Sequence, residues 1–193
     1  GQLPDRPHHR LQSLSVEFRN PLTVGVSYRL EVSTPSIDCE IVKLYDTTRL
    51  MLKATFAFAP AQVPAQLLRI HEGSSVSEAA DRTKTDLTPG TRVTGEYGPG
   101  PKEFVQVVTR WGLSGKGATS HQIAAMMWAS FLVGMELPGQ RAVFWRLILS
   151  FLPELDTHNG PFNYEAVVEE LDERYDLLHT TGTLSSGHTP GAT

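Results

Sequence analysis

Alternating apolar and polar residues predict β-strands in the first part of the chain. Leu14, Val16 and Phe18 alternate with polar residues across positions 13–19, which is the period-two pattern of a half-buried strand. Similar patterns follow at residues 27–32, 39–45 and 49–58, and Asp46-Thr-Thr48 indicates a hairpin turn before the last of these. We therefore expect these four strands to form an antiparallel meander.

The same pattern returns near the C-terminus of the sequence. Leu147, Leu149 and Phe151 alternate within residues 142–151, and further strands are expected at 163–170 and 174–183 around a turn near Asp172-Glu173. Residues 104–111 form a short amphipathic segment, and residues 185–193 have the composition of a tail or linker.

A long stretch between the two sets of strands carries turn residues instead of a hydrophobic pattern. From about residue 59 to residue 100 the chain is rich in Pro, Gly, Ser, Thr and charge, with Pro89-Gly90 and Gly98-Pro-Gly-Pro101 marking turns. Short helices are expected at residues 65–71 and 77–82. We interpret the stretch as a connector that runs over the surface.

One apolar segment stands apart from the strands. Residues 123–135 present no polar face at any helical phase, which predicts a buried helix. Thr119 and Ser120 are suited to begin it, and Leu137-Pro-Gly139 to end it, so the helix should run from about 120 to 136. The segment is shorter than the roughly 20 apolar residues that span a bilayer. An antiparallel sheet wrapped around the helix would bury it.

A weak internal similarity suggests two copies of one unit. Leu3-Pro4 matches Leu137-Pro138, and Leu14-Ser-Val-Glu-Phe18 matches Leu147-Ile-Leu-Ser-Phe151, each followed by a loop and a strand. Two unrelated antiparallel meanders are the alternative. The repeat divides the chain into a partial first unit at 1–58 without its own central helix, a connector at 59–103, and a second unit at 104–193 that contains the helix.

Composition and charge narrow the function classes. The chain has 193 residues, of which 40% are hydrophobic and 20% charged, and its net charge is −4. The 17 basic residues are scattered, so nucleic acid is not an expected partner. Neither a signal-peptide pattern nor a spanning segment appears, so we expect a cytoplasmic protein that does not enter a membrane.

Metal and disulfide chemistry are also not expected. Cys39 is the single cysteine, which excludes an intrachain disulfide and a four-cysteine zinc site. The seven histidines show neither an H-x-x-x-H nor an H-E-x-x-H spacing. No metal and no other cofactor is predicted.

The central segment and its neighbours resemble a known family. Residues 122–139, followed by Arg141-Ala-Val-Phe144 and Leu147-Ile-Leu-Ser-Phe151, are similar to the central helix and next strand of MaoC-like acyl-thioester dehydratases and hydratases. The stretch from Phe18 through Asn20-Pro-Leu-Thr-Val-Gly25 resembles the family's F-x-x-P-v-x-x-G pattern. The resemblance implies an α+β hot-dog fold, an antiparallel sheet wrapped around a long central helix at about 120–136, in a tandem or partial double hot dog.

The family's activity resides in a motif at the start of that helix, roughly D-x-N-P-x-H, whose Asp and His form an acid-base pair. Aligned by distance to the helix, the corresponding window is Lys116-Gly-Ala-Thr-Ser-His121. His121 matches the family's histidine, whereas Lys116 replaces the Asp, and Ala118 and Thr119 replace Asn and Pro. The resemblance implies His121 as the catalytic residue, with substrate bound by Lys116, Gly117, Ser120 and Gln122.

The physical chemistry of the window agrees with such a role. Histidine exchanges protons near neutral pH, and amides near Ser120–Gln122 at the positive end of the helix dipole could form an oxyanion hole. The alternative for His121 is a helix-start histidine that is exposed to solvent or satisfied by a backbone group. Ser114-Gly-Lys116-Gly117 does not match a phosphate loop, because Arg110 and Gly117 stand where that motif needs Gly and Ser or Thr. Trp128 and Phe131 are assigned to the core.

Three functions remain open. The leading one is a dehydratase or hydratase acting on β-hydroxyacyl or enoyl thioesters of coenzyme A or an acyl carrier protein, in fatty-acid or polyketide metabolism. A noncatalytic hot-dog domain that binds an acyl carrier or mediates assembly is the second, and a thioesterase the third. A carboxylate near His121, for example Glu103 or Asp156, would favour catalysis. A homodimer or a larger multidomain assembly is the expected form.

Overall fold

The computed structural model describes residues 8–61, 80, 82, 86–111, 113, 116–139, 142–152 and 161–186. The chain divides into two compact units that interleave along the sequence. Unit 1 comprises Gly1–Leu68, Val107–Gln122 and Phe144–Glu154, and unit 2 comprises Arg69–Gln106, Ile123–Val143 and Leu155–Thr193. The sequence analysis predicts contiguous units instead.

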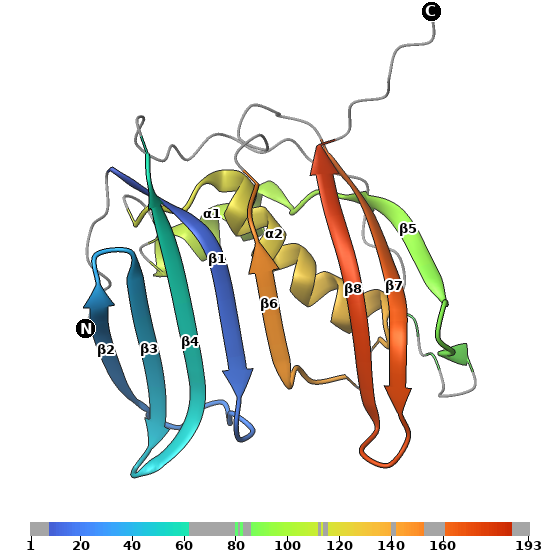
Figure 1. The fold of residues 1–193 in the computed structure, drawn as a ribbon, viewed down its shortest axis with the longest axis horizontal. Coiled ribbons are helices and arrows are strands. Elements are labelled where there is room, and N and C mark those ends of the chain that lie inside the picture. Colours follow the sequence, from blue (N-terminus) through green and yellow to red (C-terminus); the bar gives the residue numbers. More distant parts are fainter. Residues whose placement is uncertain are drawn as a thin grey trace, which may run out of the picture. The chain divides into compact units, whose positions relative to one another are not determined.

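Unit 1 is built on a five-stranded antiparallel sheet. Its strands are β1 (His9–Phe18), β2 (Arg29–Ser36), β3 (Cys39–Asp46), β4 (Arg49–Pro60) and β6 (Arg146–Ser150). Their order is β2-β3-β4-β1-β6, so β1 pairs with β4 and β6 and not with β2. The four strands are confirmed, but the four-strand meander is wrong. A long-range pairing, which strand patterns do not encode, places β1 between β4 and β6 (Figure 1).

A bulge sets which residues of β1 face the apolar side of this sheet. Leu11 pairs with Phe58 and Ser13 with Ala57, which leaves Gln12 as the extra residue. The extra residue keeps Leu11 and Leu14 on one face although they are three positions apart. The alternation from 13 to 19 therefore predicts only the part of β1 beyond the bulge.

The paired residues on this side of the sheet form what we call the apolar face of unit 1. Directly opposed residues share a face, so the register identifies its members. They are Leu11, Leu14, Val16 and Phe18 of β1, Leu52, Ala54, Phe56 and Phe58 of β4, Val42 and Leu44 of β3, Leu30 and Val32 of β2, and Leu147 and Leu149 of β6. Glu40 of β3 shares this face, because it pairs with Phe56, and it is only 2% exposed.

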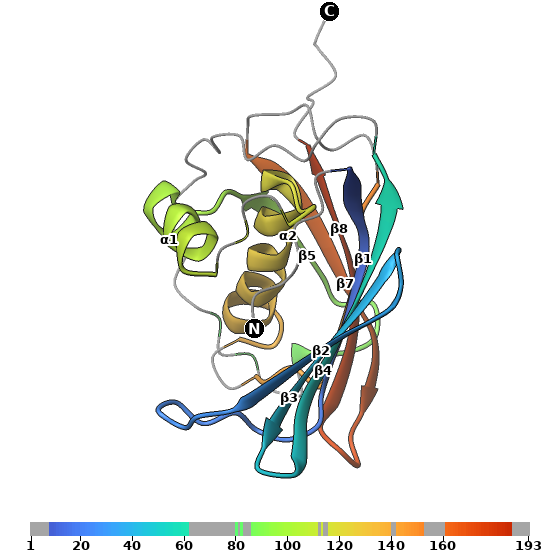
Figure 2. The same ribbon diagram turned by 90° about the vertical axis from the view of Figure 1, so that its left-hand side faces the viewer.

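Unit 2 packs a helix on a three-stranded antiparallel sheet. The sheet has the order β5-β7-β8, from β5 (Arg92–Tyr97), β7 (Phe162–Asp172) and β8 (Leu177–Ser186). Helix α2 (Ser120–Phe131) packs its buried Ala124 and Trp128 against this sheet, and Figure 2 shows α2 running along it. Trp128 lies 6.0 Å and Phe131 6.1 Å, centroid to centroid, from the ring of Tyr164. The core assignment of both residues is confirmed.

The helical segment has the predicted bounds but not the predicted burial. α2 continues without a break into a π-helix, η2 (Leu132–Glu136), which ends as the Leu137 amide bonds the Leu132 carbonyl. Ser130 is exposed, and Ala125 and Met126 are half-buried. The expectation of a helix buried on every side is therefore wrong, because a sheet packs against one face of a helix.

The predicted connector contains regular structure. Strand β5 lies within residues 59–103 and pairs with β7, and helix α1 (Pro101–Trp111) begins with Pro at its first position, which suits that residue. Val93 and Tyr97 of β5 are buried and Thr94 is exposed, so a short period-two pattern was present between the turn signals. The expected helices at 65–71 and 77–82 fall outside the described residues, apart from positions 80 and 82.

Gly182 of β8 makes room for the indole of Trp128. A Cβ on Gly182 would lie 3.0 Å from Trp128 Cη2 and 3.1 Å from the Glu165 carbonyl oxygen. We expect Gly182→Ala to lower the free energy of unfolding by about 1–3 kcal/mol through overpacking. Thermal unfolding would show this as a fall in Tm of roughly 2–4 °C per kcal/mol.

Gly134→Ala in η2 is the matched control, because a Cβ there would meet nothing within 4 Å. It should leave Tm unchanged or raise it slightly, since alanine restricts the unfolded chain more than glycine does. Equal Tm values for the two variants would contradict close packing of Trp128 on Gly182.

Candidate functional site

The N-terminus of α2 is closed by a reciprocal cap. The Gln122 amide donates to Thr119 Oγ1 at 3.4 Å, and the Thr119 amide donates to Gln122 Oε1 at 3.0 Å. This is a capping box, in which a Thr before the helix and a Gln three residues later satisfy each other's backbone amides. The cap fixes the helix start at Ser120, where the sequence places it.

The same segment is bonded to β1 through both backbone groups of Leu11. The Leu11 amide donates to the Gly117 carbonyl at 2.9 Å, and the Leu11 carbonyl accepts from Gln122 Nε2. Gly117 has a φ of 82°, a left-handed conformation that favours glycine. The last bond on the β6 side of β1 runs from the Phe151 amide to the Gln12 carbonyl. The loop before α2 bonds the next residue of the same edge, Leu11.

Four consecutive polar residues are buried at this helix start. Thr119 is 5% exposed, Ser120 1%, His121 5% and Gln122 3%. Such residues are rarely this deeply buried. Solvent exposure of His121 is therefore wrong, whereas a histidine satisfied by a backbone group stays an alternative to a catalytic one. The imidazole belongs to the first turn of α2, at the positive end of the helix dipole.

The structure places the expected substrate-binding residues in one short segment. Lys116 is half-buried in a turn in which its amide donates to the Leu113 carbonyl at 3.3 Å. Gly117 is buried against β1, and Ser120 begins the helix. Both polar ends of the Gln122 side chain serve the cap and Leu11. Substrate binding by Lys116, Gly117, Ser120 and Gln122 stays a prediction.

The two carboxylates named in advance as partners for His121 receive no support. Glu103 is exposed in the first turn of α1, with its carboxylate against Gly100. Asp156 lies outside the described residues. The sequence analysis did not single out Glu40. In the sequence, Glu40 is a charged residue among Cys39, Ile41 and Val42. This pattern alone does not show which face of the sheet the side chain lies on; the strand register is needed for that.

A second polar pair lies at the other end of the helix, within unit 2. The Tyr164 hydroxyl donates to Glu136 Oε1 at 3.3 Å, and Arg82 Nε donates to the Glu136 carbonyl oxygen at 2.9 Å. Burial and the neighbouring carboxylate of Glu136 raise the pKa of Tyr164 to about 12. A phenol that holds its proton this tightly suits a structural hydrogen bond better than proton transfer near pH 7.

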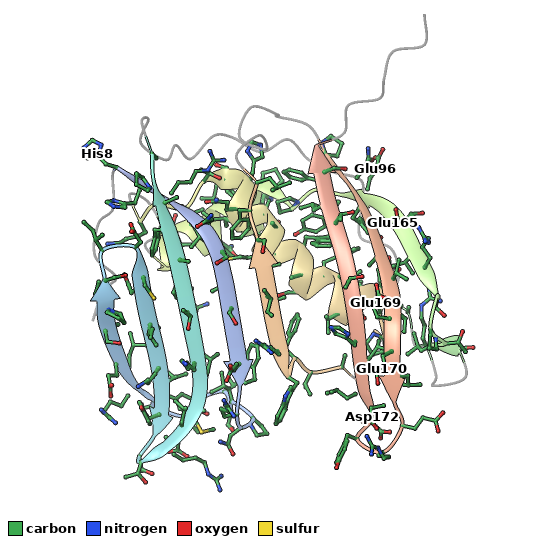
Figure 3. The ribbon with its side chains drawn as sticks, viewed as in Figure 1. His8, Glu96, Glu165, Glu169, Glu170 and Asp172 are labelled. Atoms are coloured by element: carbon green, nitrogen blue, oxygen red, sulfur yellow. The ribbon has the colours of Figure 1, made fainter. Side chains whose placement is uncertain are left out.

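Figure 3 labels a row of acidic side chains on the sheet of unit 2. Glu165 of β7 pairs with Arg92, Asp172 pairs with Arg174, and Glu169 accepts from the Thr181 hydroxyl. The Arg174 guanidinium lowers the pKa of Asp172. These contacts describe a solvated surface, and no group of three metal-ligand residues occurs among the described residues.

A shallow hollow in unit 1 is lined by Glu17, Phe18, Arg19, Trp145 and Arg146. Phe18, in this hollow, is seven residues from Leu11 along β1, which corresponds to about 23 Å at the rise of a strand. Trp145 is 60% exposed, so the hollow is open to solvent. It is separate from the site at His121.

Comparisons with known proteins give weak similarities only. No protein-family model matches the chain, and no curated protein does either. Among solved structures, the tesB protein of Mycobacterium avium subspecies paratuberculosis has 11% identity and a TM-score of 0.43, over 92% of this chain and 77% of that one. A MaoC-like dehydratase from Phytophthora capsici has 10% identity and a TM-score of 0.41, over 95% and 73%.

At these TM-scores the geometry inside each unit is the better guide to the fold. That geometry is mostly antiparallel sheet with few helices, and in unit 2 a helix lies on the sheet. No helix in the described part of the chain is long and apolar enough to cross a membrane.

The two bonds of the Gln122 side chain can be separated by mutation. Gln122→Ala removes both and should lower the free energy of unfolding by about 1–3 kcal/mol. Gln122→Glu keeps an acceptor for the Thr119 amide but turns a carboxylate oxygen toward the Leu11 carbonyl. If the bond to Leu11 is essential, urea unfolding will show Gln122→Glu to be at least as destabilised as Gln122→Ala.

Gln106→Ala, on the exposed side of α1, is the control and should change stability by no more than about 0.5 kcal/mol. Near wild-type stability of Gln122→Glu would mean that the cap alone matters and that the bond to Leu11 is dispensable.

The raised pKa of Tyr164 predicts a loss of stability in alkali. The folded chain holds the phenol proton more tightly than the unfolded chain, whose pKa is near 10.0. The resulting stabilisation is complete below pH 10 and is lost as the pH rises toward 12. Tyr164→Phe should therefore unfold with a shallower dependence on pH across this window, measured by urea denaturation at several pH values. Tyr175→Phe, whose side chain is 74% exposed, should keep the wild-type slope.

Proposed function

We propose that this chain is a hot-dog acyl-thioester dehydratase or hydratase whose site lies at the buried N-terminus of α2. The observation that carries the proposal is the burial of His121, 5% exposed, in the first turn of a helix whose start is fixed by a cap and by β1. A fixed, buried base at the positive end of a helix suits removal of a proton next to a thioester carbonyl. The family resemblance of residues 122–139 points to the same chemistry.

The dehydration follows a simple balance of bonds. His121 takes the proton from the carbon next to the thioester carbonyl, and the electrons of that C–H bond form the new double bond. The C–O bond at the β-carbon breaks, and the departing hydroxide takes the proton that His121 accepted and leaves as water. The helix dipole stabilises the negative charge that develops on the thioester oxygen in between. Hydration is the reverse sequence.

The substrate is a β-hydroxyacyl or enoyl thioester on coenzyme A or an acyl carrier protein, and no metal takes part in these steps. Fatty-acid or polyketide metabolism is the setting that such thioesters imply. A double hot-dog arrangement, a homodimer and a place in a larger assembly belong to the same proposal.

A noncatalytic domain that binds an acyl carrier is the second candidate. It is favoured by Lys116, which stands where the dehydratases place their Asp. A thioesterase is less well supported, because that role needs a carboxylate on the central helix, and Glu136 at the far end is bonded to Tyr164.

The test is turnover of 3-hydroxybutyryl and crotonyl thioesters, on coenzyme A and on a pantetheine carrier mimic. We expect interconversion by the wild-type chain and a loss of kcat of about 10²–10⁴-fold in His121→Gln. Exchange of the α-hydrogen in D2O, followed by NMR, should be lost in the same variant because it reports the proton transfer to His121 alone.

His179→Gln, an exposed histidine on β8, is the matched control and should keep full activity. If the wild-type chain binds the pantetheine mimic but shows neither turnover nor α-hydrogen exchange, the enzymatic function is overturned and the noncatalytic carrier-binding domain is supported. Release of free thiol in place of water exchange would support the thioesterase.

A further inference from the structure

Strand β2 (Arg29–Ser36) lies at one edge of the five-stranded sheet of unit 1 (Figure 1). It pairs with β3 on one side, and on its other side no strand of the described part of the chain pairs with it. The open edge of a strand presents amides and carbonyls that readily pair with another strand. The strand register shows which residues of β2 present these groups.

The backbone groups of Leu30 and Val32 point away from the sheet. In an antiparallel sheet both backbone groups of a residue point to the same neighbouring strand, and successive residues alternate. The Phe58 amide of β4 donates to the Asp38 carbonyl at 2.8 Å, so Val42, four residues further along, also bonds β4. Val32 lies opposite Val42 and therefore directs its amide and carbonyl to the open edge, as does Leu30 two residues earlier.

Large apolar side chains are exposed on this edge and beside it. Leu30 is 41% exposed although it lies on the apolar face of unit 1, opposite Leu44. Of the twelve large apolar side chains that are exposed among the described residues, five belong to β2 or to the segments next to it: Leu22, Val24, Val26, Leu30 and Ile37. Exposed apolar side chains that gather in one region are typical of an interaction surface.

The charges of β2 are complementary to a second copy of the same strand. Arg29 and Glu31 flank Leu30 on the other face of the sheet, and both are exposed, with Arg29 Nη1 3.4 Å from Glu31 Oε2. When two copies of β2 pair antiparallel about Leu30, Arg29 of each copy lies opposite the partner's Glu31. Opposite charges directly across a strand pair stabilise it, and like charges weaken it.

Other registers lose this complementarity. Pairing about Glu31 would place that carboxylate opposite the partner's Glu31. Pairing about Val32 would place Arg29 opposite the partner's Pro35. In the register about Leu30, Pro35 lies beyond the paired residues and does not obstruct the edge.

We propose that two copies of this chain associate through β2, paired antiparallel about Leu30 across a twofold axis. The Leu30 amide of each copy donates to the partner's Leu30 carbonyl, and the two five-stranded sheets become one continuous sheet. The same surface serves both copies, as a twofold interface requires. This interface is independent of the chemistry proposed for His121.

The first measurement is sedimentation equilibrium of the full chain. A single pair of strands with its flanking apolar side chains makes a small interface, so we expect a weak dimer with a Kd roughly in the micromolar range. The apparent mass should rise from that of a monomer to that of a dimer between about 1 and 200 μM.

Charge reversal tests the register. Arg29→Glu and Glu31→Arg each place like charges opposite each other twice, so each variant alone should dimerise roughly 10-fold or more weakly than wild type. An equal mixture of the two variants should restore the dimer, because every opposed pair then carries opposite charges. The double variant Arg29→Glu/Glu31→Arg should dimerise like wild type. Arg174→Glu, which breaks an exposed pair with Asp172 in unit 2, is the matched control and should leave the Kd unchanged.

A proline tests the role of the backbone. Proline is tolerated in an edge strand where its missing amide would have faced solvent, so Leu30→Pro should stay folded by circular dichroism and remain a monomer. Leu30→Val keeps both the amide and an apolar side chain and should still dimerise. The mixing experiment changes exposed side chains only, and so decides the question even if Leu30→Pro does not fold.

Three results would overturn the proposal. They are a wild-type chain that stays monomeric across the whole concentration range, a dimer that persists in both charge reversals and in Leu30→Pro, and single reversals that do not associate when mixed. Turnover of thioesters, which tests the proposed function, is not among these results. The failure of one proposal can therefore be distinguished from the failure of the other.

Discussion

The bonding of Leu11 to the start of α2 is the constraint on which the candidate site depends. A strand edge that is buried must find partners for its amides and carbonyls, because an unpaired buried backbone group is costly. β6 provides partners along β1 as far as Gln12, and beyond that point Gly117 and Gln122 take over. The helix start is therefore fixed by the same requirement that completes the sheet, and His121 is buried as a consequence.

In unit 2 the main constraint is the packing of large aromatic rings between a helix and a sheet. Trp128 and Tyr164 are accommodated because residues 182 and 95 are glycines; a Cβ on Gly95 would lie 2.7 Å from the Tyr164 hydroxyl oxygen. The same hydroxyl bonds Glu136, the last residue of η2, so the sheet also fixes the end of the helical segment. Each end of this segment is thus held by a polar contact to the unit in which it lies.

The sequence predicts local features of this arrangement well and long-range ones poorly. Helix bounds of Ser120 to Glu136 follow from a cap and from Leu137-Pro-Gly139, which are local signals. The place of β1 between β4 and β6, and the pairing of β5 with β7, depend on contacts between distant segments, which alternation cannot reveal. Glu40 was missed for this reason: within Cys-Glu-Ile-Val-Lys it is equally compatible with a solvent-facing position, and only its register with Phe56 shows otherwise.

The capping box explains the burial of two of the polar residues at this end of unit 1. Thr119 and Gln122 are accounted for by the capping box and by Leu11. Neither contact requires an imidazole at position 121, and burying a polar side chain generally lowers stability relative to an apolar residue of similar size. Proteins retain residues of this kind where function depends on them, since selection for stability alone would remove them. His121 is buried in the same first turn and is the residue of this segment that can exchange a proton near neutral pH, which supports the proposal that the acid-base chemistry lies at the start of α2.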